Sequence, residues 1–356
     1  MRARHPCRSL RDGNGEDRPR RRQSVGCVPT VFAFPVDMRS IVGLIVNPMA
    51  ARDIRRLVGH ASLVPNHEKA ALVRRLLLGL AAAGVDTVIY MPDQFSVVAS
   101  AFGRGRPPVH LDPLPLTPSG SSSDSSRAAL MLTESGASTI ITLGGDGTNR
   151  AVAAGCQQTP LVAVAAGTNN VFPTCMDATA AGLAAGLVAS GAVDLAEVVI
   201  PSKRVEVLVG TEQDFALVDA ALCADEFTGA RAVWNPDRIC ALVLTRAQPW
   251  SVGLSSIGGR ICPIDAAEPL GLYLELGGTP NVQAVLAPGL VAMVGVRDCR
   301  RIALGEAVRL PHGRFTVALD GERQFRASEV TSAMVTGNGP LVVDVHKVLA
   351  CGVGPG

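Results

Sequence analysis

The stretch STIITLGGDGTNRAVAAG, residues 138–155, places a run of β-branched residues directly before Gly-Gly-Asp-Gly-Thr. Such a run predicts a buried strand, and the glycines predict a tight turn into the helix that follows. Glycine also lets a backbone approach a ligand closely, and the N–H groups of such a turn favour an anion such as phosphate. Two interpretations stay open from this stretch alone: a structural turn, or a turn that binds phosphate.

The segments around this stretch alternate between predicted strands and helices. Short apolar runs predict strands at 40–48, 85–92, 137–145 and 159–170. Apolar residues at helical spacing predict helices at 66–84, at 125–136, from about 148, and at 177–191. Asn66 and Asp177 are predicted N-caps, and Gly84 a predicted helix end. Residues 95–125 are rich in Pro, Gly and Ser, which predicts an exposed insertion.

From about residue 195 the pattern changes to short β-rich segments separated by Gly, Pro and charged residues. Examples are FTVALDGERQF (315–325) and LVVDVHKVLA (341–350). Alternating strands and helices predict a parallel sheet, whereas closely spaced short strands are typical of an antiparallel sandwich. We therefore predict an α/β protein with a Rossmann-like parallel α/β domain at 39–195 and an antiparallel β-sandwich domain at 196–350. A cleft between two domains is the usual place for a ligand.

Composition narrows the classes of function. The 356 residues are 47% hydrophobic and 18% charged, which is enough chain and apolar surface for two ordinary domains. The net charge of +2 gives no reason to expect a nucleic-acid partner, and no run approaches the roughly 18 apolar residues of a membrane span. The nine cysteines form no CxxC pair, which predicts reduced thiols in a cytoplasmic protein. Arginine-rich residues 1–38 predict a disordered leader, and Met38 is an alternative start.

Polar turns follow three of the predicted parallel strands. Asn47 ends the first strand, Gly144, Gly145, Gly147 and Thr148 follow the third, and Gly167, Thr168, Asn169 and Asn170 follow the fourth. Ligands of open α/β sheets bind at the carboxyl ends of the strands. Three such turns at one edge therefore favour an anion-binding site over three unrelated structural turns.

LGGDGT, followed some twenty residues later by a Gly-Thr-Asn turn, resembles the superfamily of NAD kinases, diacylglycerol kinases and sphingosine kinases. VGLIVNP, NHEKAALVRRLLLGL, GGDGTNRAVA, GTNNVFP, TGARAVW and LDGE are more similar to the ATP-NAD kinase branch that includes acetoin-catabolism protein X. The resemblance covers residues 40–348. It implies an NAD kinase-like fold, in which a nucleotide-binding α/β domain and an acceptor-binding β domain together transfer phosphate from ATP to a hydroxyl.

The resemblance also implies roles for single residues. Asn47, Gly144, Gly145, Gly147 and Thr148 would hold the nucleotide phosphates, and so would the second turn, Gly167 to Asn170. Asp146 would orient or deprotonate the acceptor hydroxyl, which for NAD is the 2′-OH of the adenosine ribose. Arg150 would add a cation for phosphate. The LDGE turn (Asp320, Gly321 and Glu322) would bring a carboxylate to the cleft.

The implied cofactors are ATP and Mg²⁺, and the implied partner is a small molecule, NAD or a related hydroxyl compound. Two alternatives stay open. A lipid kinase of diacylglycerol or sphingoid type is disfavoured because Ala151 and Val171 stand where lipid kinases carry Glu and Asp. A nucleotide-binding regulator without turnover is disfavoured by the presence of Asp146. The sequence does not determine the acceptor, the metal ligands or the oligomeric state. A homo-oligomer is compatible with it.

Overall fold

The computed structural model describes residues 40–50, 59–167, 170–224, 233, 235–311, 313–327 and 331–351. They belong to one compact unit, Val36–Gly356. The predicted leader, residues 1–38, lies outside the described residues, and so do Thr168 and Asn169 of the second glycine turn.

The strands of the first half of the chain belong to a seven-stranded sheet in the order β3-β2-β1-β4-β5-β19-β6. Five of them are parallel to one another: β1 (Ile41–Val46), β2 (Thr87–Tyr90), β3 (His110–Pro113), β4 (Thr139–Gly144) and β5 (Leu161–Ala165). All six residues of β4 are buried, as its β-branched run predicts. The parallel α/β fold is therefore confirmed. Strand β3 was not predicted, because its four residues lie inside the Pro-rich stretch 95–125.

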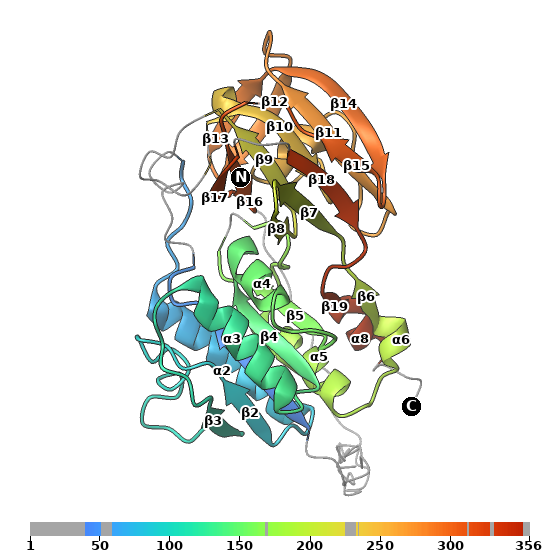
Figure 1. Cartoon of the computed structure of the whole chain (residues 1–356). Coiled ribbons are helices and arrows are strands. Elements are labelled where there is room, and N and C mark those ends of the chain that lie inside the picture. Colours follow the sequence, from blue (N-terminus) through green and yellow to red (C-terminus); the bar gives the residue numbers. More distant parts are fainter. Residues whose placement is uncertain are drawn as a thin grey trace, which may run out of the picture. The chain divides into compact units, whose positions relative to one another are not determined.

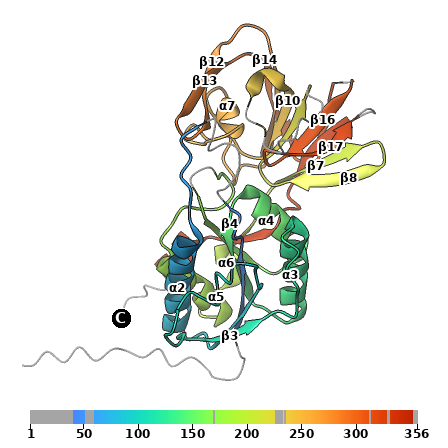
Figure 2. The same cartoon turned by 90° about the vertical axis from the view of Figure 1, so that its left-hand side faces the viewer.

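Helices cover both faces of this sheet. One face packs on α2 (Asn66–Ala82) and α5 (Ala178–Ala189), and the other on α3 (Ser122–Glu134) and α4 (Asp146–Ala153). Figure 2 shows α2 and α3 on opposite sides of the strands. Asp177 caps α5 by accepting from the N–H groups of Thr179 and Ala180, as predicted. The prediction for Asn66 is wrong, because Pro65 holds the N-cap position of α2 and Asn66 is its first helical residue.

The second half of the chain forms three antiparallel sheets. The six-stranded sheet is β14-β11-β10-β9-β16-β17 and the four-stranded sheet is β15-β18-β7-β8. Residues of both sheets share one buried core, which confirms the predicted sandwich. The first sheet consists of β9 (Asp219–Cys223), β10 (Ile239–Leu244), β11 (Leu270–Leu276), β14 (Val296–Ala303), β16 (Phe315–Leu319) and β17 (Glu322–Ala327). The second consists of β7 (Arg204–Val209), β8 (Glu212–Ala216), β15 (Ala307–Arg309) and β18 (Thr331–Thr336).

The other face of the six-stranded sheet is buried too. The hairpin of β12 (Val282–Ala287) and β13 (Leu290–Val294) packs there together with α7 (Ser255–Gly259). Alternation along β9 produces both cores: Ala220 and Leu222 face the four-stranded sheet, whereas Ala221 and Cys223 face the hairpin side. A 3₁₀ turn at Pro236–Arg238 precedes β10.

The end of the chain returns to the first sheet. β19 (Leu341–Val343) pairs in parallel with β5, and β6 (Val199–Pro201), which follows α6 (Leu195–Val198), pairs antiparallel with β19. Helix α8 (Val345–Cys351) then packs on the same core as α2 and α5 (Figure 1). The sequence predicts only β structure for 341–350, whereas Val345 and Val348 are spaced to bury one face of a helix. The domain boundaries as a whole stay a prediction.

Two connecting segments join the first sheet to the sandwich, and they are hydrogen-bonded to each other. Between the β6–β19 pair and the β7–β18 pair, Ser202 donates from its backbone and its hydroxyl to Pro340 O, at 3.0 and 2.8 Å. Gly339 donates to Ser202 O at 3.0 Å, and a Cβ at residue 339 would lie only 2.6 Å from that oxygen. The two segments therefore form one paired ribbon.

Within the described parts of the chain, none of the helices has both the length and the apolar character that a membrane crossing requires.

Candidate functional site

A cavity of about 970 Å³ lies where β1, β4 and β5 end, and residues of the sandwich complete its wall. It contains most of the residues that the sequence analysis selected. Those on its wall are Asn47, Gly145, Asp146, Gly147, Thr148, Arg150, Gly167 and Asn170. The three polar turns thus meet at one edge of the sheet, as expected for an open α/β fold.

Gly144 was also predicted to bind the ligand, but it does not line the cavity. A Cβ at this position would lie 2.5 to 2.6 Å from the side chain of Thr148. Glycine is therefore required here for the close approach of β4 and α4 rather than for contact with a ligand. Gly145, the N-cap of α4, is open to the cavity, and a Cβ there would lie 2.7 Å from Asn170 Oδ1.

Asn47 connects the first turn to the glycine turn. Its Nδ2 donates to Thr148 Oγ1 at 2.8 Å, and its Oδ1 accepts from the backbone N–H of Met49 at 2.8 Å. A threonine just after a glycine turn can either cap the helix that follows or donate to a phosphate oxygen. The structure excludes the cap, since Thr148 lies inside α4 and no side chain caps Gly145. Its hydroxyl, as the acceptor of the Asn47 bond, keeps its own hydrogen for a ligand.

The carboxylate of Asp146 binds the second turn. Oδ1 accepts from the N–H groups of Val171 at 3.0 Å and Phe172 at 2.8 Å, and Oδ2 accepts from Val171 at 3.2 Å. The residue also faces the cavity. Asp146 therefore fixes the backbone after β5 relative to α4, a structural task that the motif alone does not reveal.

Arg150 is paired with a residue of the sandwich. Its guanidinium donates to Asp214 Oδ2 of β8 at 3.0 Å, with side chains 16% and 30% exposed. Both residues line the cavity. Arg150 was predicted as a phosphate-binding cation, but in this structure an aspartate already occupies its donor. An anionic ligand would have to compete with Asp214 for the guanidinium.

The LDGE turn brings two carboxylates to the cavity. Asp320 and Gly321 have φ values of +50° and +74° in the hairpin between β16 and β17. Asp320 is buried, and its oxygens accept from the N–H groups of Leu217 at 3.0 Å and Val218 at 2.7 Å. Burial raises the pKa of Asp320 to about 8, and the neighbouring Asp219 and Asp146 carboxylates add to this effect.

Glu322 differs from the other acidic residues of the cavity. Its carboxylate has no hydrogen bond or ion pair with any described residue, whereas the carboxylates of Asp93, Asp124, Asp146, Asp214 and Asp320 each accept at least one hydrogen bond. Its Oε1 lies 3.6 Å from the position a Cβ would take on Gly147, directly beside the glycine turn. A partly exposed carboxylate without a partner at this place is free to act on a ligand.

Two groups were not predicted from the sequence, one on the cavity wall and one behind it. Residues 118–122, predicted as part of an exposed insertion, line the cavity, where Asp124 accepts from the N–H groups of Ser119 and Gly120 at 2.8 Å. The Asp behind a Ser-Gly pair is a local signal for such a turn. Arg246, which stacks on the Phe172 ring at 5.2 Å, gave no signal. Burial lowers its pKa, although Asp146 and Asp320 partly oppose that shift.

Acidic side chains outnumber basic ones on the described part of the cavity wall. Of the described residues that line it, six are acidic, as named above, and one, Arg150, is basic. In the described part of the chain, no three His, Cys, Asp or Glu side chains are grouped as ligands of a metal ion. Such a wall suits a polyphosphate only together with a cation that neutralises it, as Mg²⁺ does when it binds through one or two carboxylates and the phosphates themselves.

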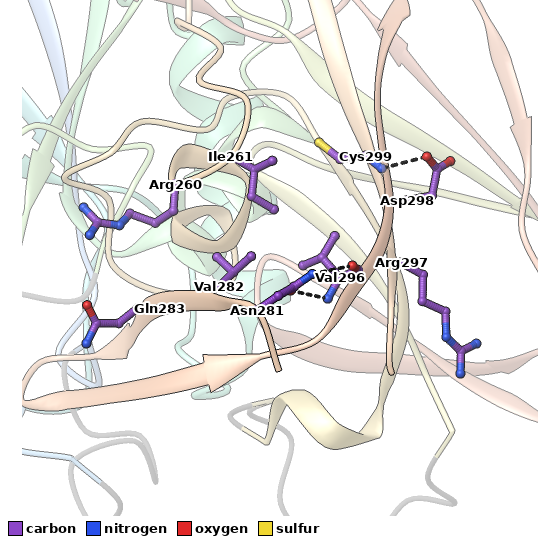
Figure 3. A pocket seen from close by; sticks show the side chains of 9 residues that line it. All are labelled: Arg260, Ile261, Asn281, Val282, Gln283, Val296, Arg297, Asp298 and Cys299. Carbon is purple, nitrogen blue, oxygen red and sulfur yellow. Dashed lines mark hydrogen bonds between the residues drawn. The ribbon is translucent and has the colours of Figure 1, made fainter. Parts of the chain in front are cut away.

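A second hollow of about 600 Å³ lies on the sandwich, between the end of α7 and strands β12 and β14 (Figure 3). Its Asn281 exchanges two hydrogen bonds with the backbone of Val296, at 2.9 and 3.0 Å. Arg260 and Arg297 point away from each other. None of the predicted site residues lies here, and its polar groups do not converge on one point.

Known families match both halves of the chain. Residues 42–192 match the ATP-NAD kinase N-terminal domain, and residues 203–338 match the acetoin catabolism protein X C-terminal domain. With the parallel sheet and the sandwich, these matches define a protein of the NAD kinase-like class. The chain is 37% identical over 303 residues to acetoin catabolism protein X of Cupriavidus necator, which covers 80% of this chain and 84% of that protein. It therefore belongs to the acetoin catabolism protein X family.

A crystal structure of a putative diacylglycerol kinase from Bacillus anthracis str. Sterne is also similar. It covers 85% of this chain and 96% of its own, with 14% identity and a TM-score of 0.40. At that level the similarity carries no argument about the site.

Proposed function

We propose that this protein is an ATP-dependent kinase that transfers a phosphoryl group to the hydroxyl of a small molecule, with NAD as the first candidate acceptor. One observation carries the proposal: a single cavity gathers the turns after β1, β4 and β5 together with the carboxylates of Asp146 and Glu322. Phosphoryl transfer needs mainly positioning and charge neutralisation, which such a cavity can supply. The match to the ATP-NAD kinase N-terminal domain supports ATP and NAD as the pair of substrates.

The nucleotide phosphates would lie against the start of α4. Backbone N–H groups at a helix N-terminus favour anions, and Gly145 and Gly147 add no side chain of their own to the cavity wall at this point. Thr148 and Asn170 add donors on either side. Mg²⁺, when bound, would neutralise phosphate charge, and Glu322 is the carboxylate available to hold it or to act on the acceptor.

The acceptor hydroxyl needs a group that orients it and one that takes its proton. We assign orientation to Asp146, whose oxygens are already acceptors for two N–H groups. We assign proton acceptance to Glu322, whose carboxylate has no hydrogen-bond or ion-pair partner among the described residues. The oxygen of the acceptor then forms a bond to the transferred phosphorus as the bond to the ADP oxygen breaks, and the proton is left on the carboxylate.

The test is transfer of label from γ-labelled ATP to NAD, to acetoin, to diacylglycerol, or to no added acceptor. Acetoin is included because the name of the Cupriavidus necator relative refers to its catabolism. We expect label on NAD. Label on diacylglycerol would support a lipid kinase instead.

Tight ATP binding without transfer to any acceptor would support a nucleotide-binding regulator. This second candidate has a specific observation in its favour, because both Asp146 and Arg150 are already engaged by protein groups. Calorimetric titration with ATP separates a regulator from a protein that has no nucleotide site at all.

Two carboxamide variants test the assigned roles. Glu322→Gln should lower kcat by about 10²- to 10⁴-fold, the usual contribution of a general base. Asp146→Asn should abolish transfer, because the amide retains only part of the hold on Val171 and Phe172. The affinity for ATP should stay within a few-fold of the wild type. Glu134→Gln, an exposed residue of α3 outside the cavity, is the matched control and should not change turnover. Normal turnover of Glu322→Gln would remove the assigned base.

A further inference from the structure

Lys69 of α2 is buried completely, and its ammonium group is hydrogen-bonded to other groups of the protein. Nζ donates to Pro48 O at 2.7 Å, to Ala50 O at 2.9 Å and to Asn66 Oδ1 at 3.5 Å. An ammonium group has three N–H donors. Burying an uncharged polar group without a hydrogen-bond partner already costs about 2–7 kcal/mol, and burying an unpaired charge costs more. The lysine therefore stands behind the turn 47–50 and holds two of its carbonyl oxygens.

That turn is closed on itself and tied to the glycine turn. Ala50 N–H donates to Asn47 O at 3.2 Å, and Met49 N–H donates to Asn47 Oδ1 at 2.8 Å. Asn47 in turn donates to Thr148 Oγ1. All four residues of the turn line the cavity, whereas Lys69 does not. A continuous set of hydrogen bonds thus runs from a buried ammonium to the start of α4.

We infer that Lys69 is a positioning residue for the phosphate-binding side of the cavity, acting through the turn 47–50 on Asn47 and Thr148. The inference rests on the proposed function, because it takes the ligand at this turn to be the polyphosphate of a nucleotide. Lys69 touches no ligand itself. It sets the turn before the ligand arrives, so that binding does not have to order it.

The physical reason lies in the two carbonyl groups. Without the ammonium, Pro48 O and Ala50 O would face the interior without their donor, and the turn would shift to regain hydrogen bonds with water. Asn47 would move with the turn, because its own backbone oxygen closes it. A displacement of about 1 Å at such a position can cost up to about a hundredfold in function.

The chain offers a matched control. Lys203 is buried as well, and its Nζ donates to the carbonyl oxygens of Asp265, Glu268 and Leu270 at 3.0, 2.7 and 2.7 Å. None of these residues lines the cavity. Lys69→Met and Lys203→Met therefore both remove a buried ammonium from backbone carbonyls, but only the first does so behind the predicted nucleotide site.

Calorimetric titration with ATP and with adenosine tests the inference. We expect Lys69→Met to raise the Kd for ATP at least about tenfold, with little change for adenosine, which lacks the phosphates. Lys203→Met should bind both as the wild type does. Unchanged ATP affinity of Lys69→Met would overturn the inference, and so would an equal loss for ATP and adenosine, which marks a general structural role. A wild-type protein that binds no ATP would refute the proposed function, and the inference with it.

A double-mutant cycle distinguishes a positioning role of Lys69 from a general structural role. If Lys69 acts through Asn47, the losses of ATP affinity in Lys69→Met and Asn47→Ala are strongly non-additive, and additive losses contradict the inference. Should Lys69→Met not fold, amide hydrogen exchange of the wild type decides. The N–H groups of Met49 and Ala50 should exchange slowly without nucleotide. Fast exchange that slows only when ATP is added would show that the ligand, not Lys69, orders the turn.

Discussion

Asp320 shows what single residues contribute to this site. It occupies the left-handed region at a hairpin turn, where Asp and Asn are tolerated better than other side chains. Its buried carboxyl group accepts backbone N–H groups from the segment between β8 and β9. The turn therefore holds Glu322, two residues later, at the cavity wall.

The raised pKa of Asp320, about 8, has a consequence for stability. The ordinary value for Asp is about 4, so the folded protein binds this proton more tightly than the unfolded chain. The free energy of unfolding should therefore fall as pH rises from about 4 to about 8, and then level off. In Asp320→Asn that decline should be absent, as measured by urea unfolding across this pH range.

Asp86→Asn, at an exposed position, is the control and should keep the decline of the wild type. An Asp320→Asn variant with the wild-type pH dependence would show that Asp320 is ionised in the folded protein at neutral pH.

At the residue scale, sequence reasoning finds groups whose signal is local. GGDGT, Asn47 and LDGE could be predicted because each motif sits at the end of a recognisable strand. Lys69, Arg246 and the partner of Arg150 could not. Their roles depend on groups far away in the chain, such as Asp214, which lies 64 residues after Arg150.

The contact between α2 and α5 is the clearest feature at the element scale. A Cβ on Gly182 would overlap the carbonyl oxygen of Leu76, and one on Gly79 would overlap the carbonyl oxygen of Thr179. The two helix backbones therefore touch. This close packing draws α5 onto α2, the helix that contains Lys69.

Gly182→Ala should destabilise the protein by about 2 kcal/mol. Alanine in a helix normally gains up to about 1 kcal/mol over glycine, but here the methyl group meets backbone that cannot move away cheaply. Thermal unfolding with Gly337→Ala as the control checks this, because a Cβ at residue 337 meets nothing. A more stable Gly182→Ala variant would mean that the helices can separate at no cost.

Elements were predictable where a long periodic pattern or a cap marks them. Helices α2 and α5 have such patterns, and Gly84 ends α2 with a φ of +81°, as glycine at that position indicates. Strand β3 and helix α8 are short, with four and seven residues. Packing against a sheet formed elsewhere in the chain, rather than local preference, gives them their structure.

At the scale of the molecule, the chain leaves the first sheet through β6 and closes it again with β19 and α8. No local pattern in 341–351 indicates that this segment will insert beside β5, some 180 residues earlier in the chain. Sequence reasoning could therefore predict the two architectures, but not that the last residues of the chain complete the first one.

Deleting residues 341–356 should destabilise the parallel sheet strongly. Val343, Val345 and Val348 are buried in its core, and their loss removes about 5 kcal/mol in total at about 1.5–3 kcal/mol for each side chain. Urea unfolding measures the difference against a chain that ends after Cys351. If both chains unfold at the same urea concentration, β19 and α8 do not stabilise the sheet.

The paired ribbon at Ser202 and Pro340 has a mechanical consequence. A single covalent linker would let the α/β part and the sandwich swivel about any axis. Two strands bonded side by side resist torsion and shear, and leave bending across the plane of the ribbon as the one soft movement. If the α/β part and the sandwich move relative to each other, the mouth of the cavity should widen and narrow along one direction only.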